Sequence, residues 1–361
     1  MKINLRKEFF GESEHELLTF GDFKVTAYKY KTGVEALRVE NRRGHIIFLP
    51  FLAQQIWRIV FDGKDLAMQT PLKEPVYSKS LMENYGMFLY HCGLTGCGAP
   101  KEEDKHLQHG ELPYSVFDKA HIECGEDENG KFIKLGGEFE YNVVYSAHYL
   151  FHPEIKLYEN DAKLRVTVSF TNLLNAPFEY MYLCHINYRP IDGAELIYSA
   201  PKDKEHIIVH KGVFPDTPPD KAEKVLSFMD AVEENPELHH IVGAEGTVFD
   251  PEVCMTVKYK GDDDNRAYTM QYKRGEGACF VNHPVDALPL PVRWISRTED
   301  VDSMGMILPA SAQHMGRAYA KRNGLLKSVG NGETVSFYME TGWISDDEAK
   351  AMESKIENIL E

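Results

Sequence analysis

The stretch AKLRVTVSFTN, residues 162–172, restricts the possible folds more than any other part of the sequence. Its apolar and polar residues alternate without a break. Successive side chains of an extended chain point to opposite faces, so all the apolar side chains of this stretch would share one face. A period of two therefore predicts a β-strand with one buried side. Residues 22–30 and 35–41 have a similar pattern and are predicted to be strands as well.

Strand patterns continue through the middle of the chain. Residues 121–151 read as successive strands, and Asn129-Gly130 within them favours a hairpin turn because both residue types tolerate positive φ. Residues 243–272 resemble a further hairpin, with an acidic tip at residues 262–264. The sequence thus predicts many short antiparallel strands joined by turns.

Helical patterns are few. Residues 220–232 follow two prolines and carry apolar residues at helical spacing. The clearest helix is predicted at residues 345–361, where Ser345 and Glu348 form a capping-box pattern. Together these patterns predict an all-β fold, a large antiparallel sandwich or barrel with few helices. We expect one large domain over residues 1–361 that closes with the C-terminal helix.

Composition limits the partners of the chain. The formal net charge of −16 and the pI near 5.4 make nucleic acid and anionic membranes poor partners, since both are polyanionic. The longest apolar run, residues 46–53, is too short to span a bilayer, and residues 1–16 lack the apolar region of a secretory signal. The six cysteines form no Cys-x-x-Cys pair, which favours reduced thiols in a cytoplasmic protein. No pattern indicates an oligomeric state.

The segment DKHLQHGELP, residues 104–113, gathers two acids and two histidines: Asp104, His106, His109 and Glu111. These residues are candidates for metal ligands, for acid–base groups, or for polar groups that hold a loop together. A spacing of three would point the two histidines to opposite faces of a strand, so they could share one ion only in a loop or turn. Gly110 and Pro113 favour such a bend.

Two other segments carry candidate site residues. In EYMYLCHINYRP, residues 179–190, His185 and Asn187 would lie on one side of a strand, where they could contact a polyol or serve the core. In ETVSFYMETGWIS, residues 333–345, Glu340 closes a predicted strand and could be either a site residue or a solvent-exposed one.

Residues 290–317 form the fourth candidate segment. Arg293 could bind sugar hydroxyls, a phosphate or another acid, and Trp294 could stack on a sugar face. The alternative is a core tryptophan flanked by surface arginines. The sequence has no Ser-His-Asp order, no glycine-rich phosphate loop and no dinucleotide fingerprint.

Three of these segments resemble motifs of the aldose 1-epimerases, the galactose mutarotase-like family. That family carries an early His-Gly-Gly motif, a histidine on a mid-chain strand and a late Leu-Glu-Thr-Gln segment. Here QHGE occupies residues 108–111, LCHIN residues 183–187 and YMETG residues 338–342, in the same order. The chain is most similar to a bacterial branch of the family described as a domain of unknown function, over roughly residues 40–345. The segments similar to that branch include FLPFLAQQIW, GAPKEEDKHLQHGELP, NPELHH, DPEV, RWISRTED and LPASA.

The resemblance implies a galactose mutarotase-like β-supersandwich and a cofactor-independent enzyme that interconverts the anomers of a sugar. It implies that His109 supports the substrate near the ring oxygen, that His185 protonates this oxygen and that Glu340 takes the proton of the anomeric hydroxyl. Asp104, His106, Glu111, Asn187 and Arg293 are then expected to bind substrate hydroxyls or to hold the site together. No metal is required by this chemistry.

Some features depart from the family. Residues 92–100 lack the arginine found shortly before the His-Gly motif of galactose-acting members, and the chain closes with a helix rather than further strands. Two alternatives therefore stay open. One is a non-catalytic carbohydrate-binding protein, and the other is a metal-dependent sugar isomerase that uses His106, His109 and Glu111.

Overall fold

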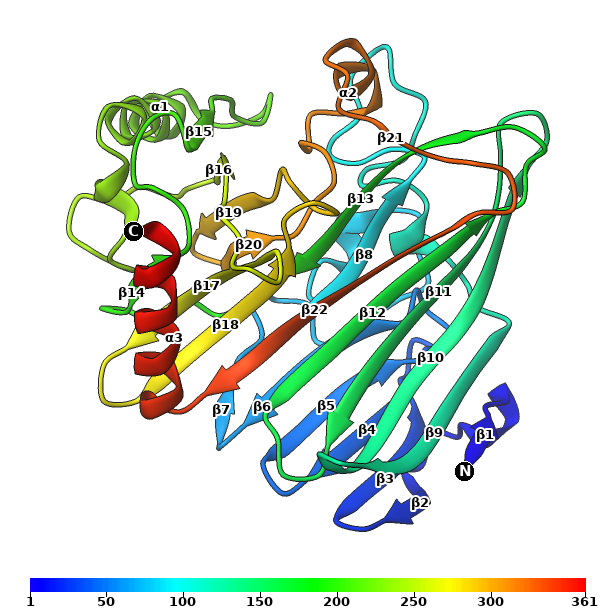
Figure 1. The fold of residues 1–361 in the computed structure, drawn as a ribbon. Helices are drawn as coiled ribbons and strands as arrows, with labels where there is room; N and C mark the ends of the chain where they lie inside the picture. Colours follow the sequence, from blue (N-terminus) through cyan, green and yellow to red (C-terminus); the bar gives the residue numbers. More distant parts are fainter.

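The computed structural model describes residues 1–361 and consists mainly of β-sheet, as predicted (Figure 1). Two nine-stranded antiparallel sheets form most of the molecule. The first sheet runs in the order β1 (Lys2–Asn4), β9 (Lys119–Asp127), β10 (Gly130–Val143), β11 (Ala147–Tyr158), β12 (Lys163–Asn172), β22 (Thr334–Ile344), β18 (Gly277–Pro284), β17 (Arg266–Lys273) and β14 (Glu195–Tyr198).

The second sheet lies behind the first in the view of Figure 1. Its order is β2 (His15–Phe20), β3 (Phe23–Lys29), β4 (Glu35–Asn41), β5 (Gly44–Leu49), β6 (Gln55–Phe61), β8 (Leu89–Leu94), β13 (Phe178–Ile186) and β21 (Lys327–Val329), with β7 (Lys64–Asp65) paired to β6. A third, four-stranded sheet contains β15 (Ile207–His210), β16 (Val253–Val257), β19 (Val292–Arg297) and β20 (Asp302–Leu308).

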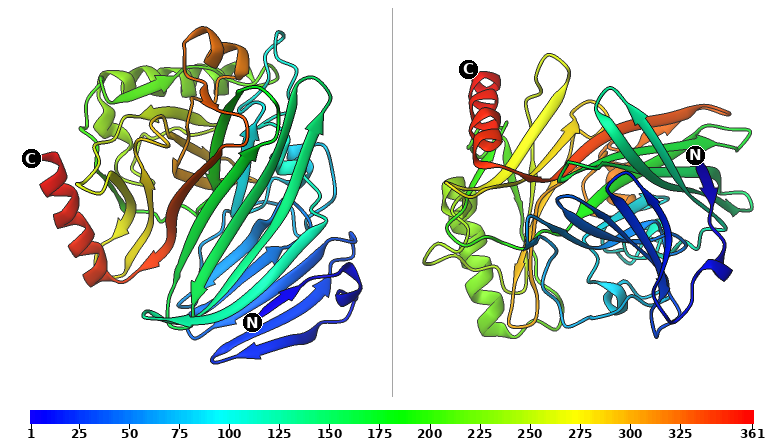
Figure 2. Two further views of the ribbon diagram at one scale, coloured as in Figure 1. Left: turned by 45° about the vertical axis from the view of Figure 1, so that its right-hand side comes forward. Right: turned by 90° about the horizontal axis from the view of Figure 1, so that it is seen from below.

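The main hydrophobic core contains residues of both large sheets, whose layered arrangement is visible in Figure 2. The alternation predicted for residues 162–172 is confirmed, because Leu164, Val166, Val168 and Phe170 of β12 are all buried in this core. The predicted strands at residues 22–30 and 35–41 correspond to β3 and β4.

Strand β13 is buried on both faces. Tyr180, Tyr182 and Cys184 pack into the main core, whereas Met181 and Leu183 pack into a second apolar cluster. That cluster also contains residues of the third sheet, among them Val292, Trp294 and Leu308. The third sheet therefore covers part of the outer face of the second sheet, and the candidate site lies at this junction.

The prediction of one hairpin within residues 243–272 is wrong. Strand β16 pairs with β15 and β19, whereas β17 pairs with β14 and β18 of the first sheet. Both strands are almost wholly buried, so the apolar pattern does not reveal which sheet each one joins. The acidic segment at residues 262–264 therefore lies on a connection between two sheets.

The predicted helices are confirmed as α1 (Pro219–Glu234) and α3 (Asp346–Leu360), and a short α2 (Arg317–Arg322) adds a third. The capping box of Ser345 and Glu348 is present at the start of α3, and Ile356 anchors this helix in an apolar cluster with strands β17 and β18. Four short 3-10 helices occupy Lys7–Phe9, Leu81–Asn84, Leu112–Tyr114 and Pro236–His239. All six cysteines are buried and unpaired, and no helix has the length and apolarity needed to cross a membrane.

Candidate active site

A pocket of about 280 Å³ opens where β13 meets the third sheet. Of its 19 lining residues, 10 are hydrophobic, which gives it the apolar walls and few polar groups typical of small-molecule sites. His109 and His185 both line it, and their rings lie 5.3 Å apart. The other polar or aromatic side chains that line it include Tyr85, Gln108, Glu252, Trp294, Ser296, Thr298 and His314.

His185 is held in one tautomer by Asn187. The Nδ2 of Asn187 donates to the Met87 carbonyl at 2.9 Å, so its Oδ1 is the acceptor that faces Nδ1 of His185 at 2.7 Å. His185 therefore carries its proton on Nδ1, and its Nε2 accepts from the Tyr85 hydroxyl at 3.3 Å. Burial, with a smaller effect of His109, lowers the pKa of His185 well below 6.5. The imidazole is thus neutral, and its Nε2 at the pocket carries no proton.

His109 stands on a tight backbone turn. It has a φ of 60°, and the following Gly110 has a φ of 81°. A Cβ on Gly110 would lie 2.5 Å from the carbonyl oxygens of Gly93 and Gly96, which explains why a glycine follows this histidine. Backbone hydrogen bonds to Gly98 (3.0 Å) and from Gly93 (2.9 Å) fix the turn against the end of β8.

Glu252 is the carboxylate of this pocket, and the sequence analysis did not identify it as a site residue. It immediately precedes β16, and its Oε2 accepts from Nε1 of Trp294 at 2.6 Å. Burial raises the pKa of Glu252 above its ordinary value. The ring of Trp294 lies 5.4 Å from that of His185, so this tryptophan contacts both titratable groups. The only signal in the sequence was the DPEV segment, noted there for resemblance alone.

A third histidine, His314, also lines the pocket. Burial lowers its pKa to about 3, so it is neutral near pH 7. Its ring packs edge-on against that of His210 at 5.2 Å. On the far side of His109, Cys97 is fully buried with its Sγ 3.8 Å from Nδ1 of His109.

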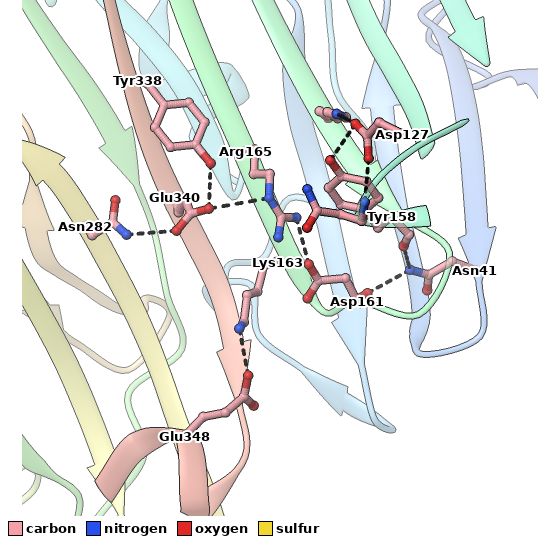
Figure 3. A network of polar contacts seen from close by, with 12 residues as sticks. Asn41, Asp127, Tyr158, Asp161, Lys163, Arg165, Asn282, Tyr338, Glu340 and Glu348 are labelled. Atoms are coloured by element: carbon pink, nitrogen blue, oxygen red, sulfur yellow. Dashed lines mark hydrogen bonds and ion pairs between the residues drawn. The ribbon is translucent and has the colours of Figure 1, made fainter. Parts of the chain in front are cut away.

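The structure does not bring Glu340 to this pocket, which corrects the predicted grouping with His109 and His185. Alternation along β22 turns Phe337 and Met339 into the main core and Glu340 to the opposite face of the first sheet. Figure 3 shows its carboxylate in a surface network, where its partners are Arg165 (3.4 Å), Asn282 (2.9 Å) and Tyr338 (2.5 Å). The two histidines come from the second sheet and its loops, so the sheet sandwich separates them from Glu340.

The four candidate site residues of the segment 104–113 do not converge on one point. Asp104 accepts from the backbone N–H groups of Lys101 (3.0 Å) and Ala318 (2.8 Å), and His106 donates from Nδ1 to the Leu107 carbonyl at 2.7 Å. Asp104 and His106 line a separate pocket beside α2, so they hold the loop rather than face the site of His109. Nowhere in residues 1–361 do three or more His, Cys, Asp or Glu side chains come together as ligands for a metal ion.

Glu111 points away from the pocket into the end of β8. Its carboxylate accepts from the backbone N–H groups of Leu94 (2.8 Å) and Thr95 (3.1 Å) and from the hydroxyls of Thr95 and Tyr149. This network ties β8 and β11 to the residue that follows the His109 turn. Glu111 therefore does not line the pocket and holds the loop of the His109 turn, one of the two roles expected of it.

Arg293 does not line the pocket either. Its neighbour Trp294 lines the pocket, and alternation along β19 buries Arg293 on the other side. There its Nε donates to the Met306 carbonyl at 2.9 Å, Nη1 lies 2.7 Å from Nε2 of His239, and the guanidinium covers the ring of Tyr198 at 4.2 Å. It thus has no access to a ligand in the pocket.

Comparison with known proteins agrees with this architecture. A crystal structure from Klebsiella pneumoniae, described as that of a "putative aldose 1-epimerase", superposes with a TM-score of 0.80 over 97% of this chain and 92% of that one, at 16% identity. The chain has a galactose mutarotase-like fold. A galactose mutarotase-like protein from Clostridium acetobutylicum matches it with a TM-score of 0.58 over 90% of this chain and 99% of that one, at 12% identity.

Comparison of the sequence with family models gives a second match. Residues 31–203 match the model of a family described as "Domain of unknown function (DUF4432)". No curated protein sequence matches the chain. The resemblance predicted from the motifs, including that to a branch of unknown function, is therefore confirmed, whereas the low identities establish the fold and not the activity.

Removal of the Glu111 carboxylate should destabilise this mutarotase-like fold. In Glu111→Ala, the backbone N–H groups of Leu94 and Thr95 lose their acceptor. We expect a loss of about 1–3 kcal/mol in the free energy of unfolding, measured by urea denaturation. Glu128→Ala, at an exposed hairpin turn, is the matched control. Equal stability of the two variants would contradict the structural role of Glu111.

Proposed function

We propose that this protein is an aldose 1-epimerase-type enzyme, which interconverts the anomers of a free sugar in the pocket of His109 and His185 without a cofactor. One observation carries the proposal: His185, with an unprotonated Nε2, and Glu252, a carboxyl group of raised pKa, line one pocket and both contact Trp294. Titratable groups whose pKa values are perturbed by burial and that line one pocket are candidates for acid–base catalysis.

The reaction requires two proton transfers. Nε2 of His185 takes the proton of the anomeric hydroxyl while the carboxyl group of Glu252 gives a proton to the ring oxygen. The bond between C1 and the ring oxygen breaks, and C1 becomes the carbon of an open-chain aldehyde. After rotation about the C1–C2 bond, the two transfers reverse and close the ring on the other face, so no atom or electron is gained or lost.

These roles differ from those implied by the family resemblance. There His185 was the acid, but a pKa well below 6.5 makes a neutral His185 the base of the resting enzyme. Glu252 replaces Glu340 as the carboxyl partner because it lines the pocket. His109, 5.3 Å from His185, is placed to hold the substrate beside the reacting groups.

Exchange spectroscopy tests the proposal. Saturation-transfer NMR on a panel of aldoses and deoxy sugars measures how fast each α-anomer becomes the β-anomer. We expect the protein to accelerate exchange for at least one sugar beyond the buffer rate. Tight binding of a sugar with no acceleration would instead support a carbohydrate-binding protein without catalysis.

The pH dependence should report the state of His185. As pH falls through its pKa, the imidazole becomes protonated and can no longer accept the anomeric proton. Because burial lowers this pKa, the acid limb of kcat/KM should lie below pH 6.5.

In Asn187→Asp, a carboxylate faces Nδ1 and favours the imidazolium, so the acid limb should move up by about 1–3 pH units. Asn129→Asp, in an exposed turn, is the control and should leave the limb in place. An unshifted limb in a folded Asn187→Asp variant would mean that His185 does not titrate in the reaction.

A further inference from the structure

The pocket offers an anionic substituent no permanently charged cationic side chain. None of its lining residues is a lysine or arginine. His185 and His314 are kept neutral near pH 7 by their lowered pKa values, and the one ionisable acid, Glu252, would repel an anion if it were charged. Burial of an unpaired phosphate, sulfonate or carboxylate here would therefore be strongly unfavourable.

The nearest arginines along the chain are already engaged. Arg293 is fully buried behind the wall of the pocket. Arg297 binds Asp302 at 2.7 Å and Asp192 at 2.7 Å and does not itself line the pocket, although its neighbours Ser296 and Thr298 do. Neither can turn toward a ligand without leaving a carboxylate or a carbonyl unpaired.

One wall of the pocket is apolar and rigid. It consists of Leu183 of β13, Cys254 of β16, Val292 of β19 and Leu308 of β20, which all belong to one buried cluster. None of these four side chains can pair with a sugar hydroxyl at full strength. At the rim, Met82 and Phe214 are apolar and exposed, at 53% and 44%.

We infer that the substrate is an uncharged monosaccharide that carries a deoxy carbon or methyl group, which lies against the wall of Leu183, Cys254, Val292 and Leu308. The inference rests on the proposed function, because it describes the ligand of the same pocket. The volume of 280 Å³ is just below the roughly 300–1,000 Å³ of drug-sized sites, which fits one sugar ring. We expect sugar phosphates, sulfonates and uronic acids to bind poorly, because no lysine or arginine lines the pocket.

Matched sugars test this inference separately from catalysis. Binding of a hexose, its 6-deoxy form, its uronic acid and its 6-phosphate is measured by isothermal titration calorimetry, and anomer exchange is measured on the same four. We expect the 6-deoxy sugar to be preferred over the hexose by about 10- to 100-fold and the two anions to bind least. Tighter binding of either anion would overturn the inference, as would preference for the hexose. If the same ranking appeared in binding without any exchange, the ligand class would stand and the proposed reaction would fail.

A variant of the wall sharpens the test. Val292→Thr keeps the branched shape and adds one hydroxyl, so it should reduce the preference for the deoxy sugar by about 10-fold. Val143→Thr, at an exposed position outside the pocket, should leave the preference unchanged. An unaltered preference in folded Val292→Thr would show that the deoxy group does not lie on this wall.

Discussion

Replacement of Glu252 with glutamine is expected to slow anomer exchange by about 10²–10⁴-fold, the usual contribution of one general acid–base group. Glutamine has nearly the same shape and can still accept from Nε1 of Trp294, so the pocket should keep its form. What it cannot do is give a proton to the ring oxygen. The rate is measured by saturation-transfer NMR at saturating sugar, and circular dichroism confirms the fold.

Glu340→Gln is the matched control. Glu340 lies on the opposite face of the first sheet, with Arg165 and Asn282 as partners, so its loss should change the rate by no more than about twofold. If Glu340→Gln were inactive and Glu252→Gln active, the catalytic carboxylate would be Glu340, as the family motif implied.

Substitution of His185 by glutamine should have an effect of similar size. The variant loses the basic Nε2, and we expect anomer exchange to fall by about 10²–10⁴-fold. Sugar binding should weaken much less, because His109, Tyr85 and Trp294 remain in place. The expected signature is therefore a fall in kcat with a small change in the dissociation constant, measured by calorimetry.

His148→Gln serves as the control for that variant. His148 lies on β11 and pairs with Glu140 at 2.7 Å, outside the pocket. It should retain the full rate. If His185→Gln lost binding and turnover in equal measure, His185 would hold the substrate rather than move its proton.

The fold was largely predictable because its strands carry a strong local signal. Alternation in residues 162–172 reports one core-facing side, and the Ser345 box marks the start of α3. The sheets that β16 and β17 join were not predictable. Both strands are buried on two faces, and an apolar run is compatible with either sheet. Sheet membership is decided by contacts distant in sequence, which periodicity does not contain.

Only part of the site was predictable from the sequence motifs. His109 followed by glycine and His185 followed by Ile-Asn both reached the pocket. Glu340 did not, because a motif match locates a carboxylate along the chain but the strand register decides the face on which it lies. Glu252 was missed because one acid before an apolar strand has no distinguishing pattern.

The most direct test of the central claim is the exchange rate of one bound sugar, measured with wild type and with Glu252→Gln at the same saturation. The account predicts that both proteins bind the sugar and that only wild type accelerates exchange. Equal exchange rates in the two proteins, at equal occupancy, would contradict a pocket in which His185 and Glu252 open the ring.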